Sequence, residues 1–100
     1  MFDYLTYTTV EGGDKRHDVV VYALSTCGFC KRALAFLSDK GIEHRYVHLD
    51  LVPLETKTRA KTALKERFGE HISFPYAVID EKTTLIGFIE ADWRKTLLDA

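Results

Sequence analysis

The hydrophobic positions of this 100-residue chain change their spacing several times, and each change predicts a different element. Residues 19–24 form a short apolar run rich in β-branched side chains, which is typical of a buried strand. Residues 28–40 then take helical spacing, and Gly41 is well suited to end that helix. Residues 42–49 predict a second strand, which should be parallel to the first because a helix joins them.

The second half of the chain predicts a helix, a hairpin and a closing helix. The first of these helices opens at Pro53 and ends at Gly69, and its expected inward positions are Leu54, Ala60, Leu64 and Phe68. Residues 76–79 and 84–87 should pair as antiparallel strands around a turn at residues 80–82. Residues 91–98 have the pattern of an amphipathic helix. The chain is therefore an α/β domain, with a mixed four-stranded sheet and about three helices.

Composition excludes several classes of function. A net charge of −1 gives no reason to expect nucleic-acid binding, which favours a basic excess. No apolar run approaches the roughly 18 residues of a membrane span. The first ten residues lack a basic segment followed by a hydrophobic one, so we expect a cytoplasmic protein without a membrane anchor.

Two cysteines stand where the first strand passes into the first helix. Cys27 falls at the helix N-terminus, where unpaired N–H groups and the helix dipole favour a thiolate. Cys30 lies one turn further on, on the same helix face as Leu34 and Leu37, so it should be the more enclosed thiol. Such a pair in a cytoplasmic protein is typically catalytic or metal-binding.

The motifs Val21-Tyr22, Cys27-Gly28-Phe29-Cys30, Ser73-Phe74-Pro75 and Ile86-Gly87-Phe88 together resemble a glutaredoxin-type member of the thioredoxin superfamily, over about residues 19–98. The resemblance implies a thioredoxin fold for residues 19–100, with residues 1–18 as an N-terminal extension. Residues 2–10 have β-favouring composition. In the resembled fold the strand at 19–24 is interior, so an added strand should lie at a sheet edge; a partly ordered tail is the alternative.

The resemblance also implies a thiol-disulfide oxidoreductase. Cys27 would attack a substrate disulfide and Cys30 would resolve the mixed disulfide, or Cys27 alone would accept glutathione from a glutathionylated protein. Lys31 and Arg32 would give electrostatic support, unless they are ordinary solvated charges. Pro75 would have a cis peptide bond and leave the Phe74 backbone free to pair with an extended ligand. The expected substrate or glutathione contacts are Thr26, Phe29, Phe74, Pro75, Gly87, Phe88 and Glu90.

The electron donor stays open between glutathione and a flavin-dependent, thioredoxin-reductase-like protein. Glutaredoxins usually have a lysine where this chain has Leu24, and paired acidic residues where it has Ile89-Glu90. Gly87-Phe88 is similar to the NrdH-type redoxins, which serve ribonucleotide reductase, although the Arg-Pro that follows in that group is absent. We expect a monomer that acts on disulfide-containing proteins, ribonucleotide reductase being one candidate, without a tightly bound cofactor.

The alternative function, from a different class, is that of a carrier for an iron–sulfur cluster. Cys-Gly-Phe is shared with monothiol glutaredoxins, which hold a [2Fe–2S] cluster between two subunits with glutathione, but Cys30 replaces their serine. A zinc site would need histidines beside the cysteines. His44 and His48 would be roughly 13 Å apart along a strand, and His17 and His71 fall in loops. We therefore expect no metal site.

Overall fold

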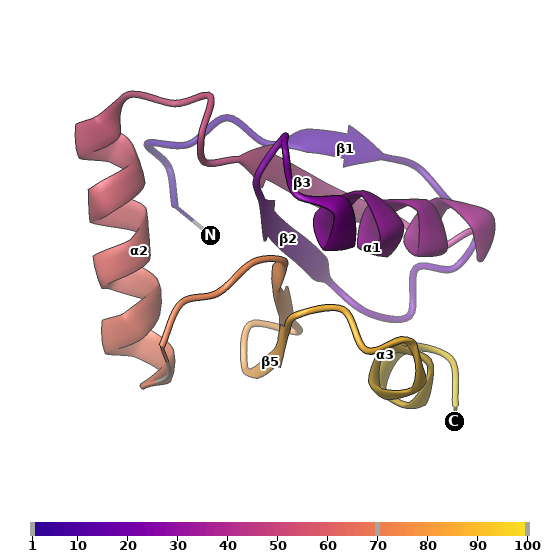
Figure 1. The fold of residues 1–100 in the computed structure, drawn as a ribbon. Coiled ribbons are helices and arrows are strands. Elements are labelled where there is room, and N and C mark those ends of the chain that lie inside the picture. The colour runs from indigo at the N-terminus through magenta and orange to yellow at the C-terminus, as the bar shows by residue number, and fades with distance from the viewer. Residues whose placement is uncertain (1, 70, 100) are drawn as a thin grey trace.

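A computed structural model describes residues 2–69 and 71–99, which form five strands and three helices (Figure 1). In chain order the elements are β1 (Thr8–Val10), β2 (Val19–Ala23), α1 (Gly28–Asp39), β3 (His44–His48), α2 (Leu54–Phe68), β4 (Tyr76–Ile79), β5 (Thr83–Ile86) and α3 (Glu90–Leu97). The predicted elements are all present, and their ends differ from the prediction by at most two residues, except that the strand predicted in residues 2–10 begins only at Thr8.

The strands form one mixed sheet in the order β1-β3-β2-β4-β5. The central strands β2 and β3 are parallel, while β4 is antiparallel to β2 and β5 is antiparallel to β4. β1 pairs antiparallel with β3 at the edge of the sheet. This confirms the predicted α/β fold and the extra edge strand.

Helices cover both faces of the sheet, because side chains of a strand alternate between its two faces. Val19, Val21 and Ala23 of β2 pack in one cluster with buried residues of α1 and α3. Val20 and Tyr22, between them in sequence, pack in a second cluster with residues of α2. Figure 1 accordingly shows α2 on one side of the sheet, and α1 and α3 on the other. β2, which is buried throughout, anchors both layers.

The N-terminal extension contains a strand of only three residues. The rest of the extension is held mainly by contacts of its aromatic side chains. Leu5 is buried, and the rings of Phe2 and Tyr4 stack with centroids 5.4 Å apart. The Tyr7 hydroxyl lies 2.8 Å from the hydroxyl of Tyr22 on β2. The β-favouring composition of residues 2–7 therefore supports packing against the α2 face of the sheet, and the predicted strand covers only the last part of this segment.

One inward position predicted for α2, Leu54, is wrong. The stripe Ala60, Leu64 and Phe68 was expected inside, and Ala60 and Leu64 are buried with Phe68 half-buried. Leu54 was also expected inside but is 76% exposed. At about 100° per residue its direction is only about 40° from that of Phe68, so the helical pattern did favour an inward position. Leu54 is, however, the first residue of α2, and none of the residues 54–59 is buried. Leu54 is therefore exposed because the beginning of α2 extends beyond the packed part of the helix.

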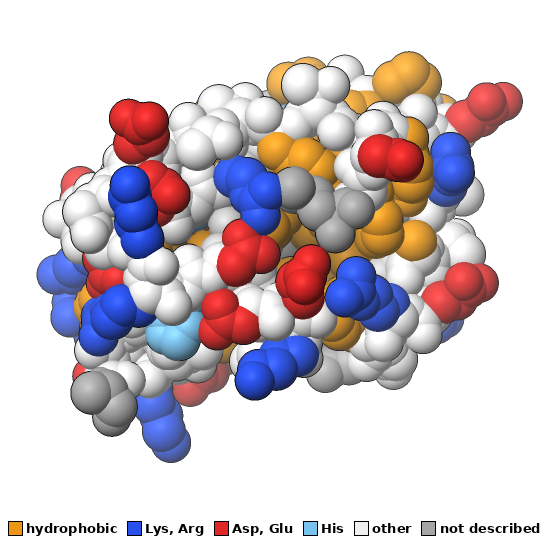
Figure 2. Space-filling model, turned by 180° about the vertical axis from the view of Figure 1, so that it is seen from behind, with side chains coloured by type: hydrophobic (Ala, Val, Ile, Leu, Met, Phe, Trp, Pro, Cys, Tyr) orange, Lys and Arg blue, Asp and Glu red, His pale blue; other side chains and the backbone are white. Residues whose placement is uncertain are grey.

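The surface seen from behind the view of Figure 1 carries charges of both signs. Figure 2 shows acidic and basic side chains interspersed on this face, with hydrophobic side chains gathered toward one side. No helix in the described ranges is both long enough and apolar enough to span a membrane.

Candidate active site

Cys27 caps the N-terminus of α1, as predicted. β2 ends at Ala23, and a tight turn follows in which the N–H of Cys27 donates to the carbonyl of Leu24 at 3.2 Å. The backbone of Cys27 is extended, and its carbonyl accepts the first helical hydrogen bond from Lys31 at 3.1 Å. Its Sγ accepts the N–H of Cys30 at 3.2 Å. One of the unpaired N–H groups at the helix start is thus satisfied by the sulfur.

The two thiols, both free in this structure, have different surroundings. Cys27 is half-buried, whereas Cys30 is 1% exposed and packs in the α1 cluster with Leu37. Burial, together with the hydrogen bond to Cys27, raises the pKa of Cys30 to about 12. The prediction that Cys30 is the more enclosed thiol is confirmed. Only Cys27 can meet a disulfide from outside without rearrangement.

A carboxylate clamp that the sequence did not reveal holds the loop before Cys27. The carboxylate of Asp50 accepts from the backbone N–H of Ser25 at 2.9 Å and also from its hydroxyl. These hydrogen bonds lower the pKa of Asp50 below its usual range. The signal available in the sequence was an aspartate directly after a strand parallel to the one that carries the cysteines. Because β2 and β3 are parallel neighbours, their following loops meet at the same edge of the sheet.

Pro75 lies at the same edge, just before β4. The Phe74–Pro75 peptide bond is cis, as the resemblance implied. Pro75 is buried, and Phe74 is half-buried between the two core clusters. The carbonyl of Pro75 accepts the N–H of Gly87 at 2.8 Å, which ties this loop to the end of β5. The N–H and carbonyl of Phe74 make no backbone hydrogen bond within the described ranges.

The segment from Gly87 to Glu90 is positioned by packing and by a ring N–H. Gly87 adopts φ +75°, in the left-handed region that favours glycine, and its carbonyl accepts from Trp93 Nε1 at 3.0 Å. The ring of Phe88 packs against Phe36 and Trp93, with centroid distances of 5.7 and 5.3 Å. Glu90 is exposed and its carboxylate accepts from Arg94, one turn along α3, at 3.1 Å. Its charge is thus already paired.

The remaining predicted residues border the cysteines directly. Thr26 is exposed in the turn, and Phe29 is 57% exposed in the first turn of α1. Lys31 and Arg32 are both exposed, and the Arg32 guanidinium lies 5.5 Å from the centroid of the Phe29 ring. The cations therefore stand beside the pair with their charges open to solvent.

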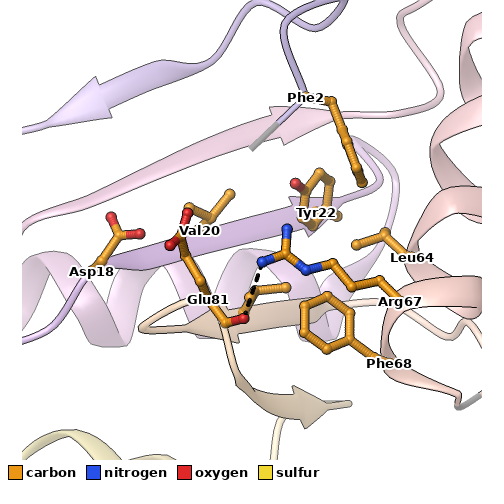
Figure 3. Close-up of a pocket in the computed structure, with 9 residues that line it drawn as sticks. Phe2, Asp18, Val20, Tyr22, Leu64, Arg67, Phe68 and Glu81 are labelled. Carbon is orange, nitrogen blue, oxygen red and sulfur yellow. Dashed lines mark hydrogen bonds between the residues drawn. The ribbon is translucent and has the colours of Figure 1, made fainter.

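The pocket drawn in Figure 3 lies on the α2 side, away from the cysteines. Phe2, Tyr22, Leu64 and Phe68 line it, and Arg67 extends across it to donate to the carbonyl of Glu81 at 3.4 Å. Its cavity of about 20 Å³ has room for about one water molecule. It is a packing gap under the arginine and too small for a substrate.

The histidines lie apart from the thiols. His17 Nδ1 is 2.7 Å from the carboxylate of Asp80. His44 is buried, with its Nδ1 2.9 Å from the Ile42 carbonyl. Within residues 2–69 and 71–99, no three His, Cys, Asp or Glu side chains are grouped closely enough to hold a metal ion.

The sheet order, the cysteine pair at a helix start and the adjoining cis-proline loop are the features of a thioredoxin-fold thiol-disulfide oxidoreductase. The glutaredoxin family model matches residues 19–83, and the chain belongs to the glutaredoxin family.

Three relatives illustrate this membership. A probable glutaredoxin from Synechocystis sp. is 34% identical over 64 residues, which cover 64% of this chain and 67% of the relative. The structure of a glutaredoxin from Methanosarcina mazei Go1 superimposes with a TM-score of 0.78 at 29% identity, covering 92% of this chain and 87% of the other. Methanoredoxin from Methanosarcina acetivorans gives a TM-score of 0.76 at 32% identity, covering 86% and 90%.

Proposed function

We propose that Cys27 is the nucleophile and Cys30 the resolving thiol of a dithiol cycle. The observation that supports this most directly is the asymmetry of the pair: the half-buried Cys27 sulfur receives a helix N–H, while Cys30 is 1% exposed behind it. The Cys27 thiolate attacks a substrate disulfide, so a Cys27–substrate disulfide forms and the other substrate sulfur leaves as a thiolate.

The second step uses Cys30. It gives its proton to solvent and attacks the Cys27 sulfur, which forms the Cys27–Cys30 disulfide and releases the remaining substrate thiolate. Reaction of Cys27 also removes its hydrogen bond and its negative charge, both of which raise the Cys30 pKa in the free dithiol. Formation of the mixed disulfide therefore makes Cys30 easier to ionise when it is needed.

The donor that we propose is a protein dithiol of the thioredoxin-reductase type, in preference to glutathione. Leu24 supplies an apolar, half-buried side chain where the resemblance places a glutathione-binding lysine. The carboxylate of Asp50 adds negative charge beside the loop, and that of Glu90 is paired with Arg94. Although Lys31 and Arg32 are exposed beside the cysteines, two positions that hold glutathione carboxylates in the resembled family are therefore apolar here at Leu24 and already ion-paired at Glu90. We further propose that the protein works as a cytoplasmic monomer on disulfide proteins, ribonucleotide reductase among the candidates.

Single cysteine variants test the roles. With a dithiol as the electron donor, Cys27→Ser should no longer catalyse the reduction of 2-hydroxyethyl disulfide, because the accessible sulfur is missing. Cys30→Ser should form a mixed disulfide and release it slowly. Full dithiol activity of Cys27→Ser would refute the assignment of roles.

The donor has a separate test. Oxidised protein is incubated with excess glutathione or with dithiothreitol, free thiols are alkylated, and the products are weighed by mass spectrometry. We expect only the dithiol to open the Cys27–Cys30 disulfide. Opening by glutathione, or a stable glutathione adduct on Cys27, would make glutathione the donor instead.

We also propose that the dithiol works without a resident iron–sulfur cluster. Each chain offers one accessible thiol, so a cluster would need a second subunit and added glutathione. Anaerobic reconstitution with iron, sulfide and glutathione should therefore leave a colourless monomer. A coloured dimer that survives gel filtration would support the cluster-carrier function.

A further inference from the structure

Trp93 is the single tryptophan of the chain, and its indole is enclosed. It belongs to α3, which covers the same side of the sheet as α1 (Figure 1). The side chain is 1% exposed and packs in the cluster that contains Cys30. A buried indole N–H needs a partner within the protein. Here the partner is the carbonyl of Gly87, 3.0 Å from Nε1, so Trp93 uses its one polar group to hold the segment that follows β5.

Gly87 is held on both sides of its own backbone. Its carbonyl accepts from Trp93, and its N–H donates to the carbonyl of Pro75 at 2.8 Å. Its φ of +75° lies in the left-handed region, so the chain leaves the line of β5 at this residue. The two hydrogen bonds therefore form a continuous link from the indole of Trp93 to the carbonyl of Pro75.

This link ends in the loop before β4. Because β2 and β4 are antiparallel neighbours, the loop lies at the same edge of the sheet as Cys27, which follows β2. Pro75 comes directly after Phe74, whose N–H and carbonyl make no backbone hydrogen bond within the described ranges. Backbone groups whose orientation is set in advance bind an extended peptide at a lower entropic cost than groups that must be ordered on binding.

The indole is itself fixed in place by contacts around α3. The ring of Phe88 packs edge-on against Trp93, with centroids 5.3 Å apart, and also contacts Phe36 of α1. At the other end of this eight-residue helix, the guanidinium of Arg16 donates to the carbonyl of Leu97 at 3.2 Å. Contacts near both ends of the helix therefore determine where the indole N–H points.

We propose that Trp93 is a positioning residue for peptide disulfides. Its indole N–H fixes Gly87, and Gly87 fixes the carbonyl of Pro75. The Phe74 backbone is thereby held ready to pair with an extended substrate. This rests on the proposed function, because the Phe74 backbone matters only if Cys27 attacks a peptide disulfide. The enclosed indole acts through Gly87 and does not itself contact the substrate.

Two variants of α3 separate positioning from stability. Trp93→Phe keeps a large apolar ring but removes the N–H. Leu97→Ala shortens another side chain of the same helix that is 1% exposed and lies in the same cluster, and this hydrocarbon side chain cannot hydrogen-bond to Gly87. The stability of both variants is measured in urea. The substrate is a short peptide whose central cysteine is in mixed disulfide with 2-mercaptoethanol, with dithiothreitol as the donor and the uncatalysed rate subtracted.

Trp93→Phe should raise the KM for the peptide about tenfold, equivalent to about 1.4 kcal/mol of binding, with kcat within about twofold. The loss falls on KM because the Phe74 backbone binds the peptide chain and takes no part in the exchange of sulfur atoms. Leu97→Ala should keep the KM of the unmodified protein even though it unfolds at lower urea concentration. An unchanged KM in Trp93→Phe, or an equal rise in both variants, would overturn the proposal. Inactivity of the unmodified protein with the peptide would refute the proposed function itself.

A spectroscopic test leaves Trp93 in place. Because the chain has one tryptophan, a ¹⁵N-labelled sample gives one indole N–H signal. Cys30→Ser protein is prepared with either the peptide or 2-mercaptoethanol attached to Cys27. The indole signal should shift in the peptide adduct relative to the mercaptoethanol adduct, since only the peptide pairs with the Phe74 backbone. The same signal position in both adducts would show that binding at Phe74 does not reach Trp93, which would contradict the proposal.

Discussion

Cys30 should resist alkylation in the folded protein far more than an ordinary thiol does. Its pKa is raised to about 12, so at pH 8 only about one molecule in 10⁴ carries the thiolate. A thiol with an ordinary pKa of about 8.5 is about a quarter ionised at the same pH. Because the thiolate is the reacting form, ionisation alone should slow the reaction by about 2,000-fold. Exclusion of the reagent from a side chain that is 1% exposed should slow it further.

The Cys27→Ser variant isolates this thiol, since it leaves Cys30 as the single cysteine of the chain. Burial, the largest cause of the raised pKa, remains in this variant. Iodoacetamide is added at pH 8, and the intact mass is followed with time in buffer and in concentrated urea. The folded sample should react at least a hundredfold more slowly than the unfolded one. Rates within about tenfold of each other would show that Cys30 is neither enclosed nor held protonated.

Three further predictions concern stability. Leu37→Ala should lower the free energy of unfolding in urea by about 2–5 kcal/mol, since Leu37 is fully buried, and a loss below about 1 kcal/mol would contradict close packing of the α1 layer. Gly69→Ala should cost about 1–2 kcal/mol because Gly69 has φ +72°, whereas Gly13→Ala, which meets open space, should stay within about 0.5 kcal/mol; equal losses would contradict this account. The hydrogen bond from His17 lowers the pKa of Asp80, so the stability it supplies is present above about pH 4 and is lost as pH falls through the folded pKa. The melting-temperature difference between the unmodified protein and His17→Ala should therefore shrink from pH 6 to pH 3, and a constant difference would argue against this link.

The sequence was most informative where one physical cause dominates. The run at residues 19–23 is apolar at every position, which predicts a strand buried on both faces. The structure shows it as the central strand β2, with all five residues buried. Cys27 was predicted at a helix start because hydrophobic spacing changes there, and it is the helix cap. Gly41 and Gly69 both follow helices with positive φ, as predicted for residues that end them.

The sequence was least informative where distant segments meet. The hydrogen bonds from Ser25 to Asp50 depend on the adjacency of two loops 25 residues apart, which local spacing does not encode. The aromatic residues before β1 have strand-like composition, yet they pack as an irregular segment because the α2 side of the sheet offers them an apolar surface. Leu54 has a helical position close to that of Phe68, and only the three-dimensional arrangement shows that its end of α2 is open to solvent.

The most direct test of the central claim is to identify the sulfur that takes the substrate. Cys30→Ser is mixed with a peptide disulfide, the reaction is quenched in acid, and fragmentation mass spectrometry locates the attached peptide. We expect the peptide on Cys27, and no adduct when the same experiment is done with Cys27→Ser. An adduct on Cys30 in Cys27→Ser, formed as fast as the one on Cys27, would contradict the division of roles that the buried and half-buried thiols imply.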